Sequence, residues 1–202
     1  MFIEENLVDQ VWEEQPAPSS NPVLVLEEKY AGRSVKDKLF DLRLDLEKIG
    51  AHAFVVTALD EIAWLLNIRG SDIPHNPVVL SYCLLTSDDC VLFIDENKLS
   101  ESSYKHLQSE GVSVKPYESV FVDLSKMNET MRDNDFVLMD PAKTSYAIYN
   151  CFNSSSVILD SSPVEKRKAI KNSVELQGFR NCHRRDGVAK VPYLLFPSHS
   201  IH

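Results

Sequence analysis

Residues 55–78 read VVTALDEIAWLLNIRGSDIPHNPV and pass from a strand into a helix and then into a loop. The strand begins a little earlier, because the run 53–58 is continuous, apolar and rich in β-forming residues, as is typical of a strand covered on both faces. Asp60 and Glu61 follow at the position where carboxylates stabilise a helix N-terminus. Gly70 then indicates a turn, for which we expect a left-handed backbone. A strand followed so closely by a helix favours an α/β fold.

The rest of the chain continues this alternation. Strands are expected at 23–26, 78–85, 90–94, 112–114, 136–139 and 157–159. Helices are expected at 34–50, 100–108, 119–127, 144–152 and, as one long element, from 162 through about 179. A polar four-residue turn joins 78–85 to 90–94, which predicts an antiparallel hairpin. The pattern therefore predicts a mixed sheet flanked by helices.

Local signals mark the ends of two of these helices. Ser34 suits an N-cap, and Gly50 suits a C-terminal stop. Ser162, Pro163 and Glu165 match a capping box with proline at the first helical position.

The quoted stretch, with residues 6–12 before it and 168–173 after it, closely resembles the second N-terminal domain of cytosolic Xaa-Pro aminopeptidases, which is of the creatinase/prolidase type. The resemblance covers most of the chain, to about Asp186. It implies a creatinase/prolidase N-terminal-like α/β fold with a ribonuclease H-like motif. It also divides the chain into a linker remnant with a short strand (1–32), the α/β domain (33–161), a connecting helix (162–186) and a divergent tail (187–202).

After Asp186 the resemblance fades, because Pro192 and Pro197 interrupt the helical pattern that the family continues. We therefore expect an abnormal terminus, from truncation, alternative splicing or a shifted reading frame, before the catalytic pita-bread domain. The family's first N-terminal domain is likewise expected to be missing.

Composition narrows the classes of function. A net charge of −9 and a pI near 5.1 disfavour binding to nucleic acid or to an anionic membrane. No apolar run approaches the roughly 18 residues of a membrane span, and the first residues lack a signal-like pattern, so we expect a cytoplasmic protein. The four cysteines form no C-x-x-C pair, and Cys83 and Cys90 are expected to be buried free thiols.

The resemblance implies chemistry that the residues here do not supply. Members of the family use two divalent metal ions, usually manganese, held by two Asp, two Glu and one His of the downstream catalytic domain. None of those ligand motifs matches a position in this chain. Its histidines are scattered, and only His199 and His202 have helical ligand spacing, close to Pro197 and the chain end. With no Gly-x-Ser-x-Gly elbow either, we expect no catalytic residue, no metal ligand and no bound cofactor in this chain.

Arg69, Asp72 and His75 are the candidate functional residues, because they cluster between a helix and a strand, where sites are commonly built. The resemblance implies that their loop faces the cleft toward the catalytic domain and positions peptide. In the alternative interpretation, Arg69 pairs with Asp72 and braces the loop, while Pro74 and Pro77 stiffen it. An independent enzyme built on the three candidates is a further, weaker interpretation.

We therefore expect a non-catalytic N-terminal fragment of a metal-dependent Xaa-Pro aminopeptidase, inactive alone. Full-length relatives release the first residue from peptides with proline at position two, so peptide would be a partner only of the longer form. The alternative is an interaction module that docks on a full-length aminopeptidase or another protein, and a homodimer is a further expectation. The basic run at 166–171 is interpreted as a solvated helix face, or else as a contact with the missing domain. Trp64 is expected to pack in the core or at a domain interface.

Overall fold

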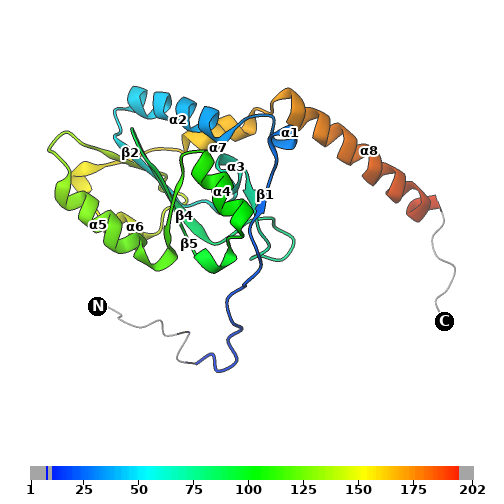
Figure 1. Ribbon diagram of the computed structural model, residues 1–202, viewed down its shortest axis with the longest axis horizontal. Helices are drawn as coiled ribbons and strands as arrows, with labels where there is room; N and C mark the ends of the chain where they lie inside the picture. Colours follow the sequence, from blue (N-terminus) through cyan, green and yellow to red (C-terminus); the bar gives the residue numbers. More distant parts are fainter. Residues whose placement is uncertain (1–7, 9–10, 196–202) are drawn as a thin grey trace.

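The computed structural model describes residues 8 and 11–195, with side chains up to residue 191, and consists of a mixed sheet covered by helices on both faces (Figure 1). The six strands run in the spatial order β6-β5-β4-β2-β7-β8. Their bounds are β2 Ala53–Val56, β4 Ser81–Thr86, β5 Cys90–Ile94, β6 Ser113–Pro116, β7 Val137–Met139 and β8 Val157–Leu159. Strand β4 is antiparallel to β2 and β5, and the other pairs are parallel. The predicted hairpin and mixed sheet are confirmed.

The predicted helices occur in the predicted order, and the described chain adds several short elements that the sequence did not predict. The α-helices are α1 Glu28–Ala31, α2 Val35–Ile49, α3 Leu59–Leu65, α4 Glu101–Ser109, α5 Val120–Thr130, α6 Tyr146–Tyr149, α7 Pro163–Ala169 and α8 Ser173–Leu195. Three 3-10 turns are η1 Glu96–Lys98, η2 Tyr117–Ser119 and η3 Ser154–Ser156. A separate two-stranded sheet joins β1 Leu24–Val25 to β3 Ile68–Arg69 in antiparallel fashion. In the described residues, no helix is long and apolar enough to cross a membrane.

Alternate residues of β2 enter two different cores, because successive side chains of a strand point to opposite faces. Phe54 packs with residues of α2, α3, α4 and α7, whereas Val55 packs with residues of α5 and α6. All four residues of β2 are buried. The prediction of a strand covered on both faces is therefore confirmed, and the two faces belong to different helix layers.

Several local signals act as predicted. The Ser34 side chain accepts a hydrogen bond from the Asp37 amide, and Gly50 ends α2 with a φ of 79°. Cys83 and Cys90 are buried free thiols with their Sγ atoms 3.7 Å apart. That contact, together with burial, raises the pKa of the Cys83 thiol well above its ordinary value.

The expected long helix from residue 162 is wrong, because the chain breaks between α7 and α8. Ile170 is extended, with a φ of −92° and a ψ of 101°. Asn172 then restarts the helix: its Oδ1 accepts from the amides of Val174 and Glu175, and its own amide donates to Glu175 Oε2 at 2.9 Å. The capping box thus lies at Asn172 and Glu175.

The capping box expected at Ser162 and Glu165 is therefore also wrong. Ser162 makes no side-chain cap bond and instead donates from its hydroxyl to Glu61 Oε2 at 2.6 Å. Glu165 is occupied by Lys143 at 2.5 Å. Both candidate capping groups are taken by tertiary partners, so the local pattern loses to contacts distant in sequence.

Smaller differences concern element ends. The helix expected at 144–152 is a single turn, and the strand expected from residue 78 begins at Ser81. Helix α8 continues through Pro192 to Leu195, so the interruption expected there is not observed; a proline within a helix can kink it without ending it. Pro197, His199 and His202 lie outside the described residues.

Candidate functional site

The three candidate residues lie in β3 and in the loop after it, and each has different surroundings. Gly70 has no left-handed φ, contrary to expectation. It is needed for close approach, since a Cβ there would lie 2.8 Å from the Val78 carbonyl oxygen. The backbone N–H of Asp72 donates a hydrogen bond of 3.2 Å to the same carbonyl oxygen. The loop therefore lies tightly against the chain that leads into β4.

Asp72 is a structural residue of this loop. Its side chain is 1% exposed, and its Oδ2 accepts from the Leu80 amide at 2.7 Å and from Lys98 Nζ at 2.8 Å. Lys98 is 4% exposed at the side chain, so the pair is buried. The predicted Arg69–Asp72 pair is wrong, because Lys98 from η1 is the partner.

His75 lies at the exposed tip of the loop. Its φ is 62°, in the left-handed region that non-glycine residues rarely adopt. The turn is closed by a hydrogen bond of 3.1 Å from the backbone N–H of Asn76 to the carbonyl oxygen of Ile73. The two residues form an isolated β-bridge. His75 is exposed, whereas the side chain of Asp72 is buried.

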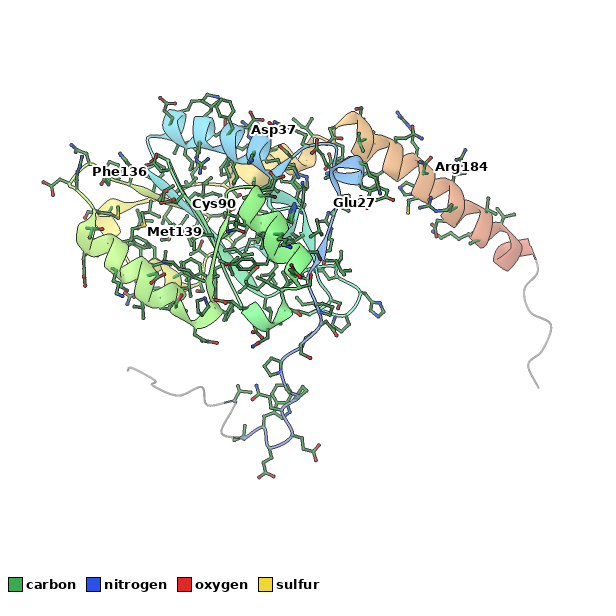
Figure 2. All side chains as sticks on the ribbon, viewed as in Figure 1. Glu27, Asp37, Cys90, Phe136, Met139 and Arg184 are labelled. Atoms are coloured by element: carbon green, nitrogen blue, oxygen red, sulfur yellow. The ribbon has the colours of Figure 1, made fainter. Side chains whose placement is uncertain are left out.

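Arg69 belongs to a different surface. Its Nη1 donates to the carbonyl oxygens of Ala63 and Ile68, each at 2.8 Å, and burial lowers the pKa of its guanidinium against an opposing effect from Glu175. It lines a groove of about 650 Å³ between α1, α3 and the start of α8, which we call the Trp64 groove. Figure 2 shows how side chains fill the body of the molecule and surround α8 where it leaves that body.

Lys38 also lines the Trp64 groove, although the sequence did not predict it as a functional residue. It is 2% exposed, donates at 2.7 Å to the Trp64 carbonyl oxygen and to Asn67 Oδ1, and has its Nζ 4.2 Å from the Trp64 ring centroid. Burial lowers its pKa to about 8, and the charges of Arg69 and Arg33 act in the same direction, against Glu175. A signal was present, because Lys38 falls in the apolar stripe of α2 at helical spacing from Val35.

Trp64 links this groove to α8. Its Nε1 donates to Glu175 Oε1 at 2.9 Å, so the indole joins α3 to the capping box of α8. The side-chain Nδ2 of Asn172 donates a hydrogen bond of 2.8 Å to the Ala31 carbonyl oxygen. Trp64 packs against the core, as expected. It also makes a specific hydrogen bond that the sequence did not predict.

A second polar cluster lies where the parallel strands β2 and β7 end, and we call it the Glu61 cluster. Glu61 is 2% exposed and accepts from Lys143 Nζ at 2.6 Å and from the Ser162 hydroxyl. Asp140 accepts from the Ser162 amide and lies 3.4 Å from Lys143 Nζ. Although burial opposes it, hydrogen bonding to Glu165 and Glu61 raises the pKa of Lys143. The sequence suggested only a helix-dipole role for Glu61.

Arg167 and Lys168 of the basic run at 166–171 form an internal tether, which corrects the expectation of a solvated face for these two residues, whereas Lys166 is exposed. Arg167 donates to Asp45 at 2.5 Å and to Asp41 at 3.0 Å, and Lys168 pairs with Asp60. These contacts fasten α7 to α2 and α3.

The described residues do not form a metal site. Among residues 8 and 11–195, no three His, Cys, Asp or Glu side chains converge in a way that could hold an ion. The carboxylates of the Glu61 cluster are occupied by Lys143. The di-manganese centre of the resembled family therefore has no donor set among the described residues.

Fold and loop together define an N-terminal domain of the creatinase/prolidase class. The family model for the creatinase/prolidase N-terminal domain matches residues 14–175, and the chain belongs to this family. Its relatives are aminopeptidases. It is 40% identical over 204 residues to the probable Xaa-Pro aminopeptidase P of Sclerotinia sclerotiorum, covering 98% of this chain and 34% of that protein. It is 42% identical over 201 residues to the corresponding protein of Pyricularia oryzae, covering 95% and 32%.

A solved structure agrees with this relationship. The X-prolyl aminopeptidase of Caenorhabditis elegans, described as a cytosolic enzyme with a di-nuclear active site, matches with a TM-score of 0.92 and 38% identity. The match covers 96% of this chain and 32% of the nematode chain. The chain thus spans about a third of the length of the relatives it matches.

Proposed function

We propose that this chain serves as the non-catalytic N-terminal domain of a cytoplasmic, metal-dependent Xaa-Pro aminopeptidase and has no peptidase activity alone. The observation that carries the proposal is the match to the nematode enzyme over nearly the whole chain, combined with the lack of a metal donor set in the described residues. Metal-assisted hydrolysis needs ions that activate water and polarise the scissile carbonyl. The groups that hold those ions, two manganese ions in the resembled family, would come from the remaining two thirds of such a protein.

The test is an activity assay on the purified 202-residue chain. It is incubated with an Xaa-Pro peptide and manganese, with a chelator control and with the full-length nematode enzyme as the positive control. We expect the nematode enzyme to release the first residue and this chain to release none. Metal-dependent release by this chain above the chelator control would contradict the proposal.

Within a longer protein, we propose that the loop at 69–77 faces the catalytic cleft and positions peptide. The exposed imidazole of His75 is the group that supports this role, whereas Asp72 and Lys98 hold the loop in place. Arg69 would act from the side of the Trp64 groove. The test replaces, one at a time, the residues aligned with these three in the full-length nematode enzyme.

The outcomes separate contact from support. Loss of the His75 equivalent is expected to raise KM several-fold with little change in kcat, since positioning groups contribute to binding of substrate. Loss of the Asp72 equivalent is expected to lower thermal stability instead. Unchanged KM for the variants at both Arg69 and His75 would remove the positioning role.

An interaction role has one specific observation in its favour. Helix α8 extends away from the body (Figure 1), and Phe179, Val188 and Val191 on it are each more than half exposed. Exposed apolar side chains on one element are typical of a surface that another protein covers. Light scattering of the chain alone, and then mixed with the nematode enzyme, tests a homodimer and a heteromeric complex. A monomer in both samples would contradict a homodimer and docking on a full-length aminopeptidase.

A further inference from the structure

The Trp64 groove combines apolar walls with a concentration of positive charge. Tyr30, Trp64 and Phe179 contribute aromatic lining. Four cationic side chains also line it, Lys38, Arg69, Lys168 and Lys171, against the single carboxylate of Glu175. This balance is unusual in a chain whose net charge is −9.

The polar groups around these cations already have hydrogen-bond or ion-pair partners within the chain. Both oxygens of Glu175 accept hydrogen bonds, from the Trp64 indole and from the Asn172 amide. Lys168 pairs with Asp60, and Lys171 donates to the Lys168 carbonyl oxygen. Within the described part of the chain, neither Lys38 nor Arg69 has a carboxylate oxygen within 4.0 Å. Two largely buried cations thus share one groove with no carboxylate in direct contact, and Glu175 acts on both from a greater distance. Burying a charge without a contacting partner is costly.

Arg69 retains donors for an incoming group. Both of its protein hydrogen bonds use Nη1, which leaves Nε and Nη2 without an acceptor in the described residues. These two atoms are not among the buried side-chain atoms that lack a partner, which are Asp72 Oδ1 and Thr144 Oγ1. Neither atom is therefore completely buried. The Nε and Nη2 edge of a guanidinium matches the two oxygens of a carboxylate.

We propose that the Trp64 groove binds an apolar carboxylate, whose oxygens contact Arg69 while its hydrocarbon part lies against Trp64 and Phe179. Lys38 supplies a second positive charge behind the contact. A groove of about 650 Å³ is of the size that small molecules occupy in proteins. The aromatic lining favours a carboxylate with an apolar body over a small inorganic anion. This inference does not depend on the proposed aminopeptidase role.

The probe is 3-phenylpropionate, and the readout is the fluorescence of Trp64. A Trp12→Phe background leaves Trp64 as the only tryptophan, because the chain contains two. Titration to about 10 mM at pH 7 is expected to give a saturable change, since weak sites for small ligands fall in the millimolar range or below. The neutral analogue 3-phenyl-1-propanol and inorganic phosphate are titrated in parallel, and each is expected to bind at least about 10-fold more weakly.

The variants assign the interaction to named residues. Arg69→Gln is expected to weaken 3-phenylpropionate at least about 10-fold, and Lys38→Met several-fold, because each removes a cation from the groove. Lys115→Met is the matched control, since Lys115 pairs with Asp123 away from the groove, and it is expected to leave binding unchanged. If Lys38→Met fails to fold, Arg69→Gln and Arg69→Lys carry the test. The lysine variant keeps the charge without the fork and should bind with intermediate strength.

Three results would overturn the proposal. Absence of a saturable change up to about 10 mM is one. Equal binding of the acid and the alcohol is the second, because the groove would then be an apolar site without a role for charge. Equal binding of phosphate and 3-phenylpropionate is the third, because it would leave no role for the aromatic lining.

Discussion

The Glu61 cluster and the Trp64 groove both surround buried charge on α3 and its neighbours, but they treat that charge differently. In the Glu61 cluster, Lys143 is within 3.4 Å of three carboxylates, and Ser162 fills the remaining oxygen of Glu61. In the Trp64 groove, Lys38 contacts only neutral acceptors and an aromatic face, and the carboxylate of Glu175 acts on it without forming an ion pair.

The difference indicates that Lys143 stabilises the fold, whereas Lys38 remains available to interact with a ligand. A buried charge with a complete set of partners stabilises one arrangement of its elements, here α3, α7 and the ends of β2 and β7. A buried charge without a counter-ion costs stability until a ligand or a proton change relieves it. The comparison therefore makes quantitative predictions about stability.

The largest effect is expected for Glu61→Ala in the Glu61 cluster. The change leaves Ser162 without its acceptor and takes the buried carboxylate away from Lys143, which should lower the free energy of unfolding by about 3 kcal/mol. Urea denaturation followed by circular dichroism measures it. A loss below about 1 kcal/mol would show that the cluster is not a stabilising unit.

The next effect concerns Lys38 and its dependence on pH. Because the pKa of Lys38 is about 8 in the folded protein against an ordinary 10.5, the unfolded chain binds more protons between these values, and stability rises with pH across that window. The free energy of unfolding of the wild type, minus that of Lys38→Met, should therefore rise by about 2 kcal/mol from pH 7 to 10.

Subtracting the variant removes the titration of every other group, including Lys143. If the difference stays flat across the window, Lys38 is not an unbalanced charge and the contrast between the two regions fails. A saturating apolar carboxylate should reduce the slope, because an anion in the groove favours the protonated form of Lys38.

A smaller effect is expected for Trp64→Phe, which keeps the ring but removes the indole donor to Glu175. Loss of one hydrogen bond should cost about 1 kcal/mol. Amide exchange in the first turns of α8 should accelerate more than exchange in β4. The matched control is Trp12→Phe, since Trp12 lies on the extended segment before β1, and equal effects of the two changes would argue against a joint at Trp64.

The sequence predicted the order of elements because hydrophobic period, caps and turns are local. Ser34 and Gly50 bound α2 as expected, since the bonds they make are within a few residues. The pair of Ser162 and Glu165 misled for the opposite reason. Both side chains are bound by residues from α3 and from the chain after β7, which no local pattern contains.

The candidate site was predicted only in part. Asp72 does brace its loop, but its partner Lys98 is 26 residues away in sequence, so Arg69 was the nearer and wrong choice. Lys38 and Glu61 were not predicted as site residues, because lysine and glutamate are usually exposed. Their positions within apolar helical stripes carried the signal, since a charged residue in such a stripe must be buried with a partner or with a cost.

The smallest effect is expected for Glu165→Ala, and it sharpens the comparison within the Glu61 cluster itself. Glu165 meets the same ammonium group as Glu61, at 2.5 Å against 2.6 Å, but its side chain is 62% exposed whereas that of Glu61 is 3% exposed. Exposed ion pairs contribute little because water screens them and the side chains lose entropy on pairing. We expect a loss below about 0.5 kcal/mol in the same urea assay. Two carboxylates on one lysine would then differ several-fold in their contribution, and burial would be the reason. A loss equal to that of Glu61→Ala would mean that the charge of Lys143, and not the buried position of Glu61, holds the cluster together.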